Sequence, residues 1–445
     1  MKEHTLGGGT DTMAQFAGKL RFRNFWIVGM VLLVMGLATD GAVLAQEKIK
    51  LRVAHMHGPS HFAARWESQL KFDEWFMAKY PHIEIERVAQ PGGSLDWFVV
   101  NAAAGTLPDI FYVTWSQGHT LAQNGITLDL TPFIQRDVEF DYDDIFPIAQ
   151  APFLVDGGIY GIAFDAGAII PYYHGDLLAE AGLAPPSSNW TLDDLLEYAR
   201  RLTRTRPDNT VEVYGLARYF DEEVINAALG VFGGAILNDE ETASLISSPE
   251  SVAALEWWSS LAIEHGVAIR PGIDYNQVFV EGNAAMTFGG SWMLDWYTAR
   301  GETDRNTNVT AFPRGPVRQT ASIAGSGYGI SRTTEHPEAA WTYLREFMGK
   351  ENFHAMWARD GSPARRSAWP TFAEIWLERN PEINIYAFME AMDYGEYIRP
   401  LGSHGARVIQ VVQEGIGMIL HEELSPLAGA QRMHELITAV LSSED

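Results

Sequence analysis

The chain has 445 residues with 57 acidic and 32 basic side chains, a formal net charge of −25, and no cysteine. The acidic balance argues against binding to nucleic acid or anionic membranes, and the lack of cysteine excludes disulfides, thiolate metal sites and a lipid-modified cysteine. Because a single core rarely organises more than about 250–300 residues, this length predicts two domains.

The N-terminus has the order basic, apolar, small that is typical of a secretory signal peptide. Three basic residues between positions 19 and 23 precede the apolar run 25–38, and residues 43–45 have the form of a cleavage site. We expect residues 1–45 to be removed after Ala45, which would leave a free periplasmic protein. No later run of about 18 apolar residues is long enough to span a bilayer.

Strands and helices alternate after this segment. Phe62, Trp66 and Leu70 lie at i, i+4 and i+8, which predicts the apolar face of a helix that Pro81 ends. The expected order is β-α-β-α-β, which predicts a mainly parallel sheet. The strands of this part are expected at 49–54, 83–86 and 109–113, and its second helix ends near Gly105.

Helix starts further along the chain are marked by capping residues. Thr191 with Asp194 three residues later predicts a capping box, and Ser248 before Pro249 predicts a second N-cap. Pro337 opens another helix in the same way. Short strands are expected at 214–217 and 324–331.

The stretch 284–292 has the pattern of a binding edge. Residues 284–288 predict a buried strand, Gly289 and Gly290 a turn, and Ser291 with Trp292 the entrance of a helix. Ligands usually bind at such an edge of an α/β sheet. An indole beside exposed helix amides suits a sugar ring better than a phosphate or a peptide, although the pattern alone equally allows Trp292 to be a core residue.

A series of motifs runs through the chain in a fixed order. They are LPDIFYV, LAQNGITLDLTPFI, YGIAFDAGAIIPYYHGDLLAEAGL, WTLDDLLEYARRLT, VFGGAILND, SSPESVAALEWW, AAMTFGGSW, SGYGISRTTEHPEAAWTYLREFM and GSPARRSA. In this order, behind a signal peptide, they resemble the extracellular solute-binding proteins of ABC sugar importers, the family that includes maltose-binding protein. The resemblance covers nearly all of the chain after residue 45.

The resemblance implies an α/β, two-lobed periplasmic binding protein fold with a hinge and an interlobe ligand cleft. The first lobe would hold 46–163 plus 310–365 and the second 164–309 plus 366–445. The hinge would lie near 160–166 and 311–313.

The resemblance also implies which side chains contact the ligand, through aromatic stacking on sugar faces and hydrogen bonds to hydroxyls. Charged residues of maltose-binding protein are replaced by Ser116 and Gln117, which puts maltose itself in doubt. The expected contacts are His57, Trp115, Ser116, Gln117, Asp165, Asp221, Glu223, Ser291, Trp292, Gly327, Tyr328 and Arg365.

Several of these residues have an alternative interpretation. Asp165 could cap a helix beginning near Gly167, and the acidic run 221–223 could complement a helix dipole. Tyr328 could be core, and Arg365 could belong to a solvated pair with its neighbour. His55 and His57 share a strand face, but a metal site needs further ligands that the sequence does not supply, so we expect neither metal nor cofactor.

The predicted function is capture of a neutral mono- or oligosaccharide by hinge closure and its delivery to an ABC permease by a monomeric, non-catalytic protein. One alternative is a binding protein for a charged solute such as a sugar phosphate or a uronate, using Arg218, Arg365 and Arg366. Another is a secreted carbohydrate-active hydrolase, in which Asp165 would oppose a carboxylate of the 221–223 run. The sequence does not name the sugar.

Overall fold

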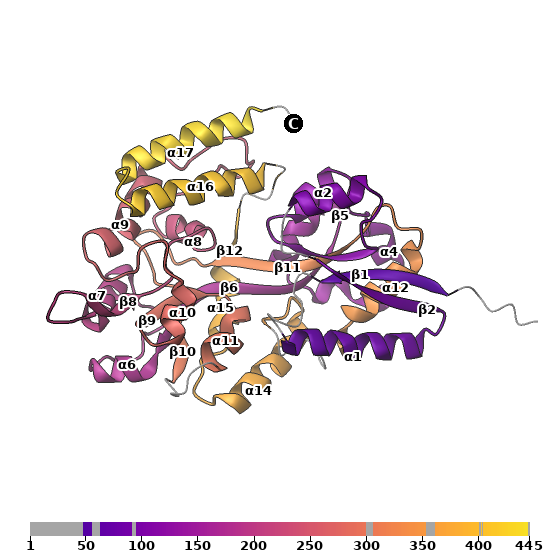
Figure 1. The fold of residues 1–445 in the computed structure, drawn as a ribbon, viewed down its shortest axis with the longest axis horizontal. Coiled ribbons are helices and arrows are strands. Elements are labelled where there is room, and N and C mark those ends of the chain that lie inside the picture. Colours follow the sequence, from indigo (N-terminus) through magenta and orange to yellow (C-terminus); the bar gives the residue numbers. More distant parts are fainter. Residues whose placement is uncertain are drawn as a thin grey trace, which may run out of the picture. The chain divides into compact units, whose positions relative to one another are not determined.

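The computed structural model describes residues 48–55, 63–90, 95–299, 306–352, 361–399, 402 and 404–443. The expected signal peptide and His57 lie outside these residues. Glu47–Asp445 forms one compact unit (Figure 1). None of the described helices is long and apolar enough to cross a membrane.

The strands of this unit are short, apart from two longer ones that lie next to each other in the sheet. They are β1 (Ile49–His55), β2 (Ile83–Ala89), β3 (Ile110–Thr114), β4 (Leu154–Val155), β5 (Gly158–Ile159), β6 (Ile162–His174), β7 (Arg204–Thr205), β8 (Val211–Leu216), β9 (Ala284–Gly289), β10 (Thr307–Val309), β11 (Ser322–Ile330) and β12 (Glu396–Tyr397).

Helices connect and cover these strands (Figure 1). They are α1 (Ala63–Lys79), α2 (Leu95–Ala103), α3 (Gly118–Gln123), α4 (Thr131–Arg136), α5 (Pro147–Gln150), α6 (Gly175–Glu180), α7 (Leu192–Leu202), α8 (Ile225–Gly230), α9 (Pro249–Ile263), α10 (Tyr275–Val280), α11 (Leu294–Ala299), α12 (Pro337–Phe347), α14 (Trp369–Arg379), α15 (Ala387–Tyr394), α16 (Gly405–Leu420) and α17 (Pro426–Leu441). Single turns of 3₁₀ helix are η1 (Val138–Phe140), η2 (Tyr142–Asp144), η3 (Ala151–Phe153), η4 (Ser291–Met293) and η5 (Arg366–Ala368).

Among the described residues, ten strands form one mixed sheet in the order β2-β1-β3-β11-β6-β9-β8-β7, with β10 beside β6 and β12 beside β11. β1 runs parallel to β2 and β3, as the alternating pattern of residues 49–113 predicts, and β8 runs parallel to β9. β11 is antiparallel to β3 and β6, and β6 is antiparallel to β9. The expectation of a parallel sheet is therefore right for β1, β2 and β3, from which it was derived, but the sheet as a whole is mixed, and β7 is also antiparallel to β8.

β6 and β11 join the two parallel blocks. Residues 162–169 of β6 pair with β11, whereas residues 170–173 pair with β9. β11 begins beside α8, where the amide of Ala227 donates to Ser322 Oγ at 3.1 Å, and it ends in its pairing with β3. Every residue of both strands is buried, as expected for strands covered on both faces.

Residues 310–317 pack on the β9 side of these joining strands. The amide of Thr310 donates to the Pro171 carbonyl at 3.0 Å, and that of Val317 donates to the Val231 carbonyl at 3.1 Å. The second segment of the predicted first lobe begins within this stretch. The chain returns to the first block along β11, and the lobe boundaries themselves stay a prediction.

The helix starts predicted at Thr191 and Ser248 are confirmed. Thr191 and Asp194 form the expected capping box of α7, and Ser248 accepts a hydrogen bond from the Ser251 amide at 3.2 Å at the start of α9. Leu70 is predicted to lie on the buried apolar face of α1, and this prediction is wrong, because Leu70 is 40% exposed. α1 instead buries the face of Asp73, whose carboxylate pairs with a β2 arginine beneath the helix.

Candidate functional site

At the centre of the sheet, a row of residues that pair with one another across neighbouring strands runs through the joining strands β6 and β11. We call it the crossing row. Ser326 of β11 lies opposite Thr114 of β3 on one side and opposite Asp165 of β6 on the other. Asp165 in turn forms a bridge with Pro363. Four segments far apart in sequence therefore meet here, and most of the predicted ligand contacts lie on or beside this row.

Asp165 belongs to a strand, so its alternative interpretation as a helix cap is wrong. Its Oδ1 accepts hydrogen bonds from Ser326 N at 2.7 Å and from Ser326 Oγ at 2.6 Å, and the residue is 7% exposed. The register of β6 and β11 shifts just after this pair, between Ser326 and Gly327. The carboxylate thus holds the two strands together at an irregular point of the ladder.

Trp115, Ser116 and Gln117 follow the end of β3, as predicted. The amide of Trp115 donates to the Gly325 carbonyl at 3.0 Å, which places this turn beside the crossing row. The side chain of Gln117 is buried and accepts a hydrogen bond from the Thr114 amide at 3.0 Å, so it shapes the turn. Ser116 is half-buried, and its hydroxyl lies 3.3 Å from that of Thr114.

The Gly-Gly-Ser-Trp turn follows β9 and leads into η4, as the sequence predicts. Ser291 is buried, and its Oγ accepts a hydrogen bond from Ser362 N at 2.8 Å, with the Ser362 hydroxyl also bound to it. The half-buried indole of Trp292 lies against the backbone of Gly167 in β6, because a Cβ built on Gly167 would lie 2.9 Å from Trp292 Cζ3. A Cβ on Gly290 would overlap the same ring.

Asp221 and Glu223 are joined to one buried arginine at the end of β8. Arg218 Nε pairs with Asp221, and Arg218 Nη2 lies 2.6 Å from Glu223 Oε2. Asp221 Oδ1 also accepts hydrogen bonds from the amides of Glu223 and Val224. Burial alone would lower the pKa of Arg218, but the two carboxylates outweigh it and raise that pKa well above its ordinary value.

Glu222 is the third acidic residue of this loop, and unlike Asp221 and Glu223 it forms no ion pair with Arg218. Burial raises the pKa of Glu222, and the negative charge of Asp221 raises it further. The loop therefore combines an ion pair network with a carboxyl group whose pKa is raised above its ordinary value.

Three predicted contacts, Gly327, Tyr328 and Arg365, lie in the packed interior. A Cβ on Gly327 would overlap the Ile162 carbonyl, so this glycine allows close strand packing rather than close approach of a ligand. Tyr328 is 1% exposed, and its hydroxyl is 2.7 Å from His55 Nδ1. Its core interpretation is therefore the correct one.

Arg365 is 1% exposed, so its alternative interpretation as a solvated residue is wrong. Its guanidinium donates to the carbonyls of Met348 and Phe140, both at 2.8 Å, and lies 3.3 Å from Asp144 Oδ2. It fastens the Gly-Ser-Pro-Ala-Arg turn to the 3₁₀ segments η1 and η2. In the described part of the chain, no group of three or more histidine and carboxylate side chains could hold a metal ion.

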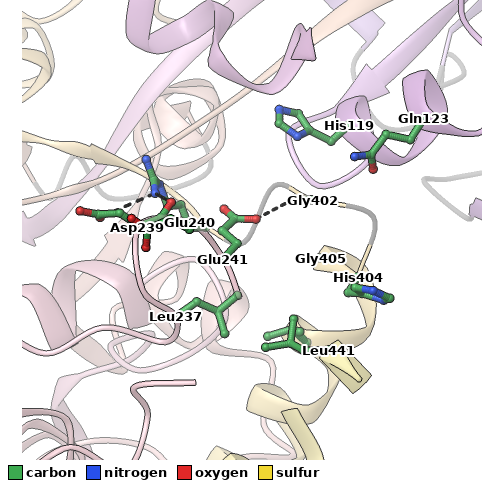
Figure 2. A pocket seen from close by; sticks show the side chains of 12 residues that line it. His119, Gln123, Leu237, Asp239, Glu240, Glu241, Gly402, His404, Gly405 and Leu441 are labelled. Atoms are coloured by element: carbon green, nitrogen blue, oxygen red, sulfur yellow. Dashed lines mark hydrogen bonds and ion pairs between the residues drawn. The ribbon is translucent and has the colours of Figure 1, made fainter. Parts of the chain in front are cut away.

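A pocket of about 400 Å³ lies between α3, the turn 237–241 and the start of α16 (Figure 2). His119 of α3 faces it together with the carboxylates of Asp239, Glu240 and Glu241. Burial lowers the pKa of His119. Neither Trp292 nor Asp165 lines this pocket, and sequence reasoning missed it. The acidic run 239–241 after a glycine-rich motif was the available signal, but a run of charges is more often a solvated turn.

Comparisons with known proteins agree with this arrangement. A family profile described as "Bacterial extracellular solute-binding protein" matches residues 71–383. The maltodextrin-binding protein MdxE of Bacillus subtilis (strain 168) is 25% identical over 273 residues, 59% of this chain and 62% of that protein. The arabinooligosaccharide-binding protein of the same organism is 22% identical over 355 residues, 74% of this chain and 78% of that protein. The chain thus spans less than two thirds of the first of these relatives.

The fold is similar to that of an ABC substrate-binding protein of Listeria monocytogenes in complex with cycloalternan. The TM-score is 0.78 at 21% identity, and the match covers 89% of this chain and 100% of that chain. This likeness confirms the predicted α/β, two-lobed binding-protein fold.

Proposed function

The chain belongs to the bacterial extracellular solute-binding protein family, and we propose that it captures a neutral mono- or oligosaccharide and delivers it to the permease of an ABC importer. It would act in the periplasm as a monomer without chemical conversion of the solute. Relatives named for binding maltodextrin and arabinooligosaccharide support a carbohydrate as the solute.

The observation that carries this proposal is the position of Trp292. A half-buried indole at the end of β9 is held against the backbone of β6, one of the two strands that join the parallel blocks. An aromatic face fixed in this way can cover the C–H face of a sugar ring at little cost in side-chain entropy. The hydroxyl of Ser116 and the atoms of the 115–117 turn approach the same crossing row and would supply hydrogen bonds.

Closure of the cleft would depend on the two joining strands, β6 and β11. β6 and β11 connect the two blocks, so small changes of backbone dihedrals along them would move one block against the other. Solute contacts made by both blocks exist only in the closed form, and binding would therefore shift the population toward that form. The permease would recognise the closed form.

The side-chain partners disfavour the two alternatives. A charged solute needs arginines that converge on it, but Arg218 is held by two carboxylates and Arg365 by carbonyls of the interior. A hydrolase needs two carboxylates on opposite sides of the bond to be cleaved. Asp221 and Glu223 lie on one loop and bind the same guanidinium, and Asp165 binds Ser326.

The proposal is tested by thermal shift and calorimetry with glucose, maltose, maltotriose, lactose and mannitol, with glucuronate and glucose 6-phosphate as charged probes. We expect a neutral sugar to raise the melting temperature and to be recovered unchanged. Trp292→Ala should weaken its binding by about 1–3 kcal/mol, on the order of 10-fold to 100-fold in Kd. Trp75→Ala on the exposed side of α1 is the matched control and should bind normally.

Two results would contradict the proposal. Conversion of the sugar, detected by product analysis, would indicate an enzyme. A larger shift with the charged probes than with every neutral sugar would indicate a charged solute.

A further inference from the structure

A second pocket lies beside the loop that follows β8. Its volume is about 220 Å³, and its wall includes Arg218, Tyr219, Asp221, Arg270 and Leu420. Asp221 is both part of this wall and a predicted solute contact. A solute that reaches Asp221 could therefore extend into this pocket.

One polar atom of the pocket wall, the hydroxyl oxygen of Tyr219, lacks a hydrogen-bond partner among the described residues. Tyr219 itself is only 3% exposed. Burial raises the pKa of Tyr219, so the hydroxyl keeps its proton and can both donate and accept. A buried hydroxyl without a partner destabilises a protein, which makes a bound group that completes it favourable.

The charges of the wall are already neutralised. Arg218 pairs with Asp221 and Glu223, and Arg270 Nη1 lies 2.6 Å from Glu422 Oε1. An anion or a cation in the pocket would have to disrupt one of these pairs. Most of the remaining wall is apolar, with side chains such as Leu420 and Ile273. The pocket thus favours a neutral group with C–H surface and one hydroxyl or ether oxygen.

We propose that this Tyr219 pocket holds one neutral sugar unit at the end of an oligosaccharide whose neighbouring unit lies at Asp221. The volume is below the roughly 300–1,000 Å³ of pockets that take drug-sized ligands, which fits one ring and not a chain. This inference rests on the proposed function and makes it narrower: the solute is an oligosaccharide, and Tyr219 contributes to the selection of chain length.

Calorimetry with glucose, maltose and maltotriose, or with the mono-, di- and trisaccharide of whichever sugar gives the largest thermal shift, tests the inference. Tyr219→Phe removes only the hydroxyl, and Ile273→Trp narrows the pocket from a position that is 45% exposed. We expect both variants to bind the longer sugars about tenfold more weakly and the monosaccharide normally. Tyr219→Phe should also raise the melting temperature of the sugar-free protein.

The matched control is Tyr394→Phe, which removes another buried tyrosine hydroxyl, one that does not line this pocket. It should leave every affinity unchanged. Equal affinities of Tyr219→Phe, Ile273→Trp and the unmodified protein for all chain lengths would overturn the inference and leave the proposed function intact. A protein that binds no sugar in any form would overturn the proposed function and the Tyr219 pocket together.

Discussion

Replacement of Gly167 by alanine tests how the Trp292 platform is held. The added Cβ would lie 2.9 Å from Ser291 Oγ and 2.9 Å from Trp292 Cζ3, closer than real Cβ contacts allow. The indole must therefore move away from β6, or the turn must shift. Overpacking of this kind costs about 1–3 kcal/mol in the free energy of unfolding. A half-buried ring can swing outward, so we expect the lower half of this range.

The same change should weaken sugar binding, because the displaced indole no longer lies where the solute meets it. The assays are urea unfolding, tryptophan emission and calorimetry with the sugar that stabilises the unmodified protein. Gly417→Ala is the matched control: it lies within α16 with no atom close to the new Cβ, and should stabilise the protein by about 0.5–1 kcal/mol. If Gly167→Ala gains stability to the same extent and keeps its sugar affinity, Trp292 does not depend on β6 for its position.

Two further predictions concern the loop after β8. Arg218→Met leaves two carboxylates without their buried partner and should lower the free energy of unfolding, measured with urea, by about 3–5 kcal/mol. The control Arg204→Gln breaks an exposed ion pair and should lower it by less than about 1 kcal/mol. Equal losses of stability in the two variants would contradict the role of burial. The raised pKa of Glu222 means that stability falls as pH rises above the ordinary pKa of about 4.3. Glu222→Gln should therefore be more stable than the unmodified protein at pH 7 and equal to it near pH 4, and a gap that is the same at every pH would refute this.

The elements of the fold were largely predictable because their signals are local. A capping box at Thr191, an N-cap at Ser248 and the buried strand before Gly289 each follow from a few neighbouring residues. The direction of β6 and β11 was not predictable in this way. It depends on which block of strands the chain joins next, which is a property of the whole topology and leaves no mark in the residues of either strand.

The apolar face of α1 shows a second limit. Leu70 fits the periodic pattern, yet it is exposed because the buried face of α1 is centred on Phe72 and Phe76, with Asp73 at its edge paired with Arg87 of β2. A charged residue predicts solvent exposure until its partner is known. The partner here is 14 residues away in a different element, and the buried face of the helix is rotated from the predicted one so that it includes Asp73.

The same ambiguity affects the predicted solute contacts. Solute-binding residues and residues that fasten distant segments are chemically alike, since both are polar groups in places that exclude water. Arg365 has the donors to bind a solute, but it uses them on carbonyls of segments more than 200 residues away in the sequence and on Met348. Tyr328 has a hydroxyl that could bond to a sugar, but this hydroxyl is hydrogen-bonded to His55. A polar residue can be assigned to solute binding only after such internal bonds are counted. The half-buried Trp292 differs in kind, because its ring would bind a sugar by stacking and not through a hydrogen bond that another residue already occupies.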